Sequence, residues 1–140
     1  MTYISAYLTF GGNCRHAMNF YKECLGGELS IQTIADSPMS DKIPEKIGEG
    51  ILHSSLIKEG LIIMASDMTD EKRLIRGNSV SLMLNCSSEE EIRIYYSRLS
   101  CGGRATHPLE NTFWGALFGD LTDKFGIHWL LNYNKGGQPN

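Results

Sequence analysis

Apolar and polar residues alternate along the chain with two different periods, which follow one another in a fixed order. Residues 4–10 have the two-residue alternation of a strand with one buried face. The next segment has apolar residues at the three- and four-residue spacing of a helix stripe: Ala17, Phe20, Tyr21, Cys24 and Leu25. The pattern therefore predicts a strand and then a helix, which Asn13 can cap at its start and which Gly26 and Gly27 end.

The same order returns in the second half of the chain. Residues 80–86 alternate like a strand, and a second helical stripe follows, formed by Ile92, Tyr95, Tyr96 and Leu99. A capping box can start this helix, either from Ser87 with Glu90 or from Ser88 with Glu91. A second glycine pair ends the stripe as the first pair does, so the chain is predicted to contain two copies of one module.

Three further strand-like segments follow each predicted helix. They lie at residues 28–35, 51–57 and 61–68 in the first half, and at residues 104–107, 113–121 and 127–133 in the second. The segments 58–60 and 123–126 have the composition of hairpin turns. Each half is therefore predicted to be a βαβββ module, and the fold class to be α+β.

Two segments stand outside this repeat. Residues 36–49 carry two prolines and alternating charges, which is typical of an ordinary solvated connection and also compatible with a lid over a site. Residues 136–140 are polar and rich in glycine and proline, so we expect a disordered tail.

Composition narrows the classes of partner. The chain has 140 residues, a net charge of −3 and no cluster of Lys and Arg, so nucleic acid is not expected to bind. No apolar run approaches the roughly 20 residues of a membrane span. The first residues lack a basic signal-peptide region, which favours a cytoplasmic protein. The four cysteines have neither zinc-site spacing nor the density of a disulfide scaffold, so we expect reduced thiols without a chemical role.

Several segments resemble one protein family. The stretches "YLTFGGNCRHAMNFYKECLGGE", "IIMASD" and "NTFWGALFGDLTDKFGIHWLLN" are similar to the PhnB-like branch of the vicinal oxygen chelate superfamily, which includes glyoxalase I, bleomycin-resistance proteins and extradiol dioxygenases. The resemblance covers about residues 3–134. It implies a single domain over residues 1–135, with modules at about 1–70 and 77–135. It also implies that each module curls a mixed sheet into half of a cup with its helix outside, and that the protein is a homodimer.

The resemblance also implies where a metal would bind. In metal-dependent relatives four ligands come from the first and last strand of each module, and those positions here hold Ser5, Met64, Ser81 and Leu130. None is a usual ligand of Mg, Mn, Fe, Ni or Zn, so neither a metal nor another cofactor is expected. Strand alternation places His128 on the face of Leu130, with no carboxylate of matching parity expected nearby.

The cup implied by the resemblance would be lined by six side chains: His53, Met64, Trp114, Phe118, His128 and Trp129. Trp114 and Phe118 are predicted to share one strand face, and the opposite face carries Gly115 and Gly119, which leave room either for a pocket or for the packed helix. His53 is either a hydrogen-bonded histidine of the cavity or a general base. His16 and His107 are expected to be solvated and without a role.

Three function classes follow from these observations. The first is a metal-independent protein that binds a small, partly apolar organic molecule. The second is an enzyme, either a metal-dependent lyase, isomerase or dioxygenase with an atypical ligand set, or a metal-free one with His53 as its base. The third is a partner-binding role. Some PhnB-like proteins carry the name of a ubiquinone-type methyltransferase, which we reject here because "TFGGN" lacks the spacing of a nucleotide-binding loop.

Overall fold

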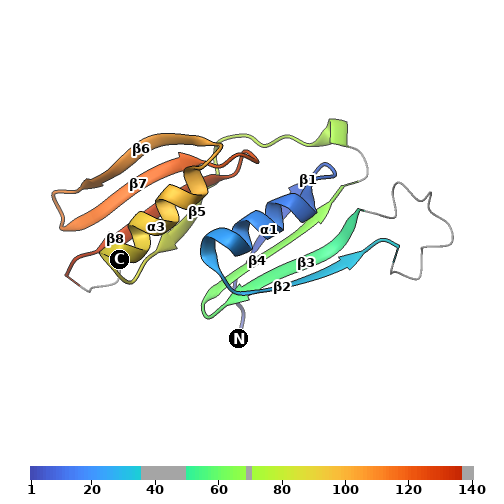
Figure 1. Cartoon of the computed structure of the whole chain (residues 1–140), viewed down its shortest axis with the longest axis horizontal. Helices are drawn as coiled ribbons and strands as arrows, with labels where there is room; N and C mark the ends of the chain where they lie inside the picture. The colour runs from blue at the N-terminus through green and yellow to red at the C-terminus, as the bar shows by residue number, and fades with distance from the viewer. Residues whose placement is uncertain (36–49, 69–70, 137–140) are drawn as a thin grey trace. The chain divides into compact units, whose positions relative to one another are not determined.

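The computed structural model describes residues 1–35, 50–68 and 71–136 (Figure 1). The chain divides into two compact units, Met1–Ile75 and Arg76–Asn140. The predicted loop or lid over residues 36–49 and residues 137–140 of the predicted tail lie outside the described residues.

The first unit contains one helix and one four-stranded sheet among its described residues. Its elements are β1 (Ala6–Phe10), α1 (Cys14–Leu25), β2 (Glu28–Thr33), β3 (Ile51–Lys58) and β4 (Leu61–Asp67), followed by the short 3-10 helix η2 (Glu71–Arg73). The sheet order is β1-β4-β3-β2, with β1 parallel to β4 and the other pairs antiparallel.

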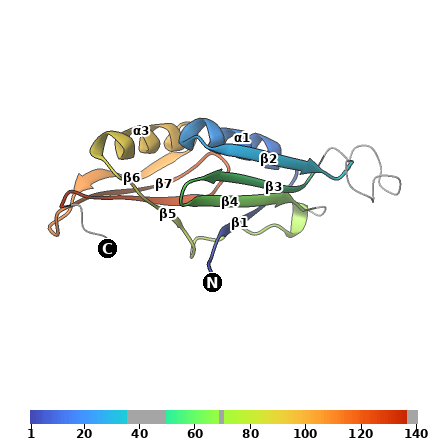
Figure 2. The ribbon, with the colours of Figure 1, turned by 90° about the horizontal axis from the view of Figure 1, so that it is seen from below.

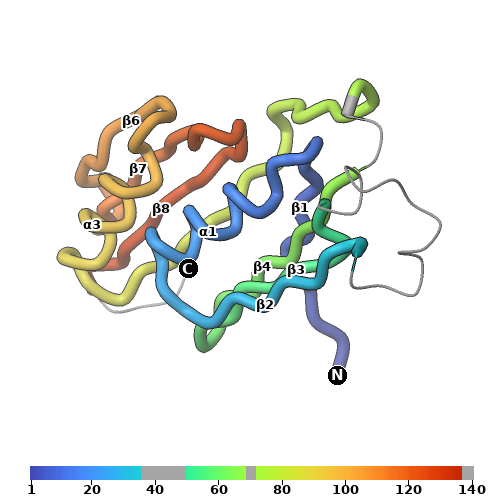
Figure 3. The backbone as a smooth tube through the Cα atoms, turned by 45° about the vertical axis from the view of Figure 1, so that its right-hand side comes forward, coloured from blue at the N-terminus to red at the C-terminus, as the bar shows by residue number. Residues whose placement is uncertain are grey.

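The second unit repeats this arrangement. Its elements are β5 (Leu82–Asn85), α3 (Glu89–Ser100), β6 (Arg104–Asn111), β7 (Ala116–Thr122) and β8 (His128–Asn134). The sheet order is β5-β8-β7-β6, with β5 parallel to β8. In each unit the helix connects the first strand, at one edge of the sheet, to the second strand, at the other edge (Figure 3). The last strand of the unit then pairs with the first. The predicted βαβββ modules and the α+β class are confirmed.

Each sheet has one face buried against the helix of its own unit (Figure 2). The buried side chains alternate along the strands, as in Leu56, Ile63 and Ala65 of the first unit and Leu117, Leu121, Trp129 and Leu131 of the second. The residues between them lie on the opposite side of the sheet, which we call the open face. On the open face lie Tyr7, His53, Ser55 and Met64 in the first unit, and Met83, Phe118, Asp120, Thr122, His128 and Leu130 in the second.

Within the described residues, the α-helices α1 and α3 begin with different caps. Ser88 caps α3 by accepting a hydrogen bond from the Glu91 amide at 3.0 Å, which confirms Ser88 as the cap, while the Glu91 carboxylate accepts from the amide and hydroxyl of Ser87 instead of closing the predicted box on Ser88. Asn13 stands at the start of α1 but makes no side-chain cap bond, so that prediction is wrong. The Asp67 carboxylate at the end of β4 instead accepts bonds from the amides of Gly12 and Cys14, at 2.9 and 3.0 Å.

Asp67 also holds the start of β3, because its second oxygen accepts from the Ile51 amide at 2.9 Å. Replacing Asp67 with alanine leaves these three amides without their acceptor and is expected to lower the free energy of unfolding by roughly 2 kcal/mol. The matched replacement of Asn13 should cost less than about 0.5 kcal/mol. Urea denaturation of both variants tests this, and a larger loss at Asn13 than at Asp67 would contradict it.

The hairpin between β6 and β7 differs from the prediction. β6 continues to Asn111, and β7 begins at Ala116, so Phe113 and Trp114 lie in the connecting turn and Trp114 does not share a strand face with Phe118. The turn forms because Thr112 bonds Ala116 through both backbone and side chain, while Gly115 adopts a φ of 90° that glycine tolerates.

Among the described residues, no helix has the length and apolar character needed to cross a bilayer.

Candidate functional site

The open face of the first unit holds two predicted site residues, His53 and Met64, and both lie beside Tyr7. Met64 is registered opposite Tyr7 on β1 and Ser55 on β3. The His53 ring lies 6.0 Å from the Tyr7 ring, measured between centroids, and both side chains are exposed. Neither ring nitrogen of His53 has a hydrogen-bond partner in the part of the chain that the structure describes. His53 therefore has the exposure of a base but no carboxylate to orient it.

Two of the four positions equivalent to metal ligands lie in each unit, and Met64 and Leu130 are on the open face of their own unit. Met64 is registered opposite Tyr7, and Leu130 is registered opposite Met83, where the first and last strands of each unit pair. Ser5 and Ser81 directly precede those first strands. A thioether, an alkyl group and two hydroxyls do not supply the nitrogen and carboxylate donors of a divalent metal site. Within the described ranges, no three His, Cys, Asp or Glu side chains gather in a metal-binding group.

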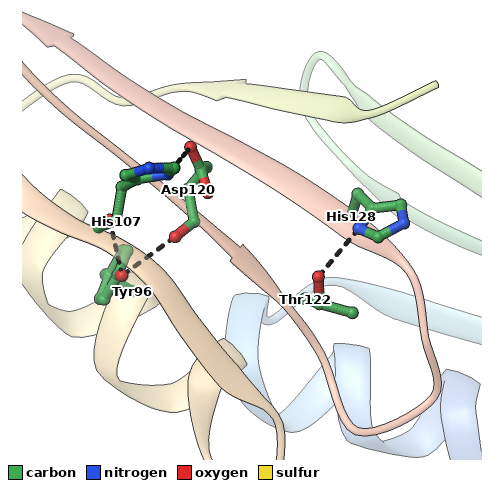
Figure 4. A network of polar contacts seen from close by, with 5 residues as sticks. All are labelled: Tyr96, His107, Asp120, Thr122 and His128. Carbon is green, nitrogen blue, oxygen red and sulfur yellow. Dashed lines mark hydrogen bonds and ion pairs between the residues drawn. The ribbon is translucent and has the colours of Figure 1, made fainter. Parts of the chain in front are cut away.

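His128 uses both ring nitrogens for structural contacts, of which Figure 4 shows the one with Thr122. Nε2 lies 3.1 Å from the Gly77 carbonyl, which can only accept, so Nε2 carries the hydrogen. Nδ1 lies 2.8 Å from the Thr122 hydroxyl, which therefore donates to it. His128 lies on the open face as predicted, but it ties the segment before β5 to β8.

A second polar network joins His107, Asp120 and Tyr96 (Figure 4). The Nδ1–H of His107 donates to the Asp120 carboxylate at 2.8 Å. The hydroxyl of Tyr96, a residue of α3, contacts the backbone carbonyls of His107 and Asp120 at 2.8 and 3.1 Å. Burial, and then the negative charge of Asp120, raise the pKa of Tyr96, which keeps this hydroxyl protonated as a donor.

These contacts correct two expectations. His107 is exposed, as the sequence predicted, but it lies within β6 and is paired with a carboxylate, whereas no partner was expected. Asp120 is registered opposite Leu130, so a carboxylate does share the face of Leu130 and His128.

The register of β6 explains why His107 was missed. Arg104, His107 and Glu110 are paired with Thr122, Asp120 and Phe118, so three residues of β6 span two of β7 at each step. Such bulges turn side chains away from the face that simple alternation assigns. The space beside Gly119 is filled by this strand, because a Cβ there would meet the His107 carbonyl and the Leu109 side chain, both at 3.0 Å. Neither a pocket nor the helix occupies it.

The aromatic residues predicted for the site lie in three different environments. Phe118 is partly exposed on the open face of the second unit. Trp114 is 58% exposed at the hairpin tip, where it packs edge-on against Phe113. Trp129 is only 1% exposed on the helix side of the sheet, and its indole N–H donates to Asp123 at 2.8 Å. The structure thus does not bring Trp114 or Trp129 onto the open face.

The cysteines are free thiols without the environment of a nucleophile. Cys14 is buried at the first turn of α1, and burial is the main cause that raises its pKa to about 11. Burial likewise raises the pKa of Cys86 to about 12. Both thiols therefore stay protonated at neutral pH, although Cys14 lies where a helix start could have favoured the thiolate.

Comparison with known proteins agrees with this architecture. Residues 2–132 match a protein family described as 3-demethylubiquinone-9 3-methyltransferase. Protein YjdN of Escherichia coli strain K12 is 32% identical over 145 residues, which cover 94% of this chain and 95% of that protein.

Solved structures show the same relationship. Protein PA1353 from Pseudomonas aeruginosa is 34% identical with a TM-score of 0.81, over 96% of this chain and 98% of that chain. A PhnB protein from Bacillus cereus, described as a candidate 3-demethylubiquinone-9 3-methyltransferase, is 26% identical with a TM-score of 0.76, over 94% of this chain and 99% of that chain. Glyoxalase-related and bleomycin-resistance-type structures share the fold at lower identity.

Proposed function

Because the chain belongs to the PhnB-like branch of the glyoxalase/bleomycin resistance/dioxygenase superfamily, the family that carries the methyltransferase description, we propose that it is a metal-independent small-molecule-binding protein. The ligand is a partly apolar organic molecule, and the open face of each unit offers it a binding surface. The observation that carries this proposal is the chemistry of the positions where metal-dependent relatives have ligands, because Met64 and Leu130 offer apolar contact there and no donor for a divalent ion.

The methyltransferase description does not fit the site. A nucleotide cofactor bound after a first strand needs free amides at the start of the following helix. Here the amides of Gly12 and Cys14 are bonded to Asp67, whose negative charge also disfavours an anionic group. The description therefore names the family and not an activity of this chain.

The open faces offer apolar groups, which neutral hydrogen-bonding groups flank in the first unit. Met64 lies beside Tyr7 and Ser55 there, and Phe118 lies on the open face of the second unit, where Asn132 opposite it is only 2% exposed and bonds to Asn85. Such a surface suits an uncharged molecule, because few fixed cations are available to pair with an anion.

We also propose that the protein is a homodimer in the cytoplasm, as the resemblance implies, and sedimentation equilibrium tests the dimer.

Binding of the uncharged dye Nile red to metal-depleted protein tests the proposal. We expect the fluorescence of the dye to rise on binding and to be unaffected by EDTA. Truncation of Met64 or Phe118 to alanine should weaken binding by about tenfold, since each removes apolar contact worth roughly 1–2 kcal/mol. The matched replacement of Trp114 by alanine should leave the affinity unchanged, because Trp114 lies off the open face.

Metal analysis and calorimetric titration with Ni, Mn, Fe(II) and Zn complete this test. If the protein binds metal stoichiometrically and the dye binds only when the metal is present, the proposal is overturned. That result would favour the metal-dependent lyase, isomerase or dioxygenase. Failure of the dye to bind the folded protein would overturn it as well. An enzyme with His53 as its base has no support from the geometry, because nothing in the described part of the chain orients that ring.

A further inference from the structure

We propose that His107 and Asp120 form a proton-transfer dyad on the open face of the second unit. Nε2 of His107 accepts a proton from an uncharged weak acid that has an apolar body. The inference deepens the proposed function and rests on it, because it names the chemical class of the ligand and what happens to it.

The orientation of His107 carries the inference. Nδ1–H donates to Asp120, which fixes the tautomer and leaves the lone pair of Nε2 as the acceptor. Nε2 has no partner within the described ranges, and the side chain is 74% exposed, so a ligand can reach it. The other two histidines of the open faces lack this combination. His128 has both nitrogens engaged, and His53 has no carboxylate.

The backbone beneath the pair is braced from the helix side. The Tyr96 hydroxyl contacts the carbonyls of both His107 and Asp120, which holds β6 and β7 together at the dyad. The bulges of β6 aim His107 at Asp120, and Gly119 lets the bulged strand approach. Tyr96 is thus a positioning residue. The stability of the His107–Asp120 pair alone does not explain why Tyr96, the bulges and Gly119 all fix its position, because an exposed ion pair contributes at most about 1 kcal/mol.

The neighbours of the dyad select the ligand. Leu130 is registered opposite Asp120, and Phe118 precedes Asp120 by two residues on the same face, so an apolar body finds contacts on both sides. Glu110 is registered opposite Phe118, and Arg104 opposite Thr122. Two carboxylates, Asp120 and Glu110, against one guanidinium disfavour a ligand that arrives already as an anion, whereas an anion formed by proton transfer at Nε2 is paired with the imidazolium of His107. His128 on β8 shares this face, and the Tyr96 hydroxyl of α3 reaches the backbone of the pair from the helix side.

The step is a simple proton transfer. An O–H, N–H or S–H bond of the ligand breaks, its electron pair stays on the ligand, and an N–H bond forms at Nε2. The ligand becomes an anion, and His107 becomes an imidazolium held against the Asp120 carboxylate. The charge of Asp120 compensates the new cation, as expected for a carboxylate that orients a histidine base.

The probe for this inference is 4-nitrophenol, whose anion is yellow, with 4-nitroanisole as the matched molecule that has no acidic hydrogen. At a pH below the pKa of free 4-nitrophenol, we expect bound probe to show the absorbance of the anion. His107→Gln and Asp120→Asn should reduce that absorbance at least fivefold and leave 4-nitroanisole affinity within twofold. His16→Gln, an exposed change on α1, should behave as the wild type.

The Tyr96→Phe variant separates positioning from folding. Loss of the hydroxyl should shift the pH at which bound 4-nitrophenol ionises toward that of the free probe, with 4-nitroanisole affinity unchanged. A variant that merely loosened the fold would weaken both probes together.

Three outcomes would overturn the dyad. They are 4-nitrophenol bound without ionisation, equal ionisation in His107→Gln, and no binding of either nitro compound. The Nile red titration decides the proposed function separately, so dye binding together with any of these three results would reject the dyad and retain the binding protein.

Discussion

Replacement of Asp123 by alanine is expected to lower the free energy of unfolding by roughly 3–4 kcal/mol. Asp123 is only 3% exposed and its carboxylate serves three donors between β7 and β8. Oδ1 accepts from the amides of Phe125 and Ile127 at 2.8 and 3.1 Å, and Oδ2 accepts from the Trp129 indole. Alanine leaves these groups without their acceptor in a buried place, which costs more than losing an exposed bond. Guanidinium denaturation measures the loss.

Two further variants separate the parts of this network. Asp123→Asn keeps one acceptor oxygen but turns an NH2 group toward one of the donors, so an intermediate loss is expected. Trp129→Phe removes the indole N–H donor and part of a fully buried ring, and should cost roughly 2–3 kcal/mol without changing Nile red affinity. If Trp129→Phe weakened dye binding and left stability intact, Trp129 would belong to the ligand site and this assignment would fail.

A methyl group at Gly103 is expected to have the second large effect, a loss of roughly 3 kcal/mol. A Cβ at this position would lie 2.3 Å from the Thr122 carbonyl oxygen and 2.7 Å from the Asp123 carbonyl carbon. These are backbone atoms of the β7–β8 hairpin, so they cannot rotate aside as a side chain can. The chain after α3 must therefore shift away from the hairpin. Thermal unfolding of Gly103→Ala should show a clearly lowered Tm.

The first unit and a turn glycine provide the comparisons for Gly103. Gly27 has the same place in the repeat, and a Cβ there would lie 2.8 Å from the Ile57 carbonyl oxygen, so Gly27→Ala should also destabilise. Gly60 has no atom within 4 Å of the added carbon, and its replacement should change stability by less than about 0.5 kcal/mol. Equal effects at Gly60 and Gly103 would show that close approach is not the reason for the glycine.

The features that sequence predicted are those that local spacing determines. The apolar stripe from Ala17 to Leu25 predicted a helix, because a helix repeats its face every three to four residues, and α1 confirms that prediction. The cap of α1 could not be found in the same way. Its acceptor is Asp67, which is distant in sequence and reaches the helix only because β4 pairs with β1.

The candidate site was harder to predict because both faces of the second sheet carry apolar residues. Trp129 and Leu130 are neighbours on β8, and strand geometry sends their side chains to opposite faces, but hydrophobicity alone does not say which one is buried. The predicted strand 104–107 was ended at His107 because Pro108 follows it. In the structure Pro108 lies within β6, which is an edge strand and tolerates a residue without an N–H.

The irregular course of β6 has a consequence for self-association. An exposed edge strand is a template on which another chain can add a strand, and proteins prevent this with bulges, prolines and charges. β6 combines all three, since its register shifts on both sides of His107, Pro108 offers no donor, and Arg104 and Glu110 are exposed. Within this sheet, strand addition that leads to ordered assembly or to aggregation is therefore confined to the opposite edge, β5.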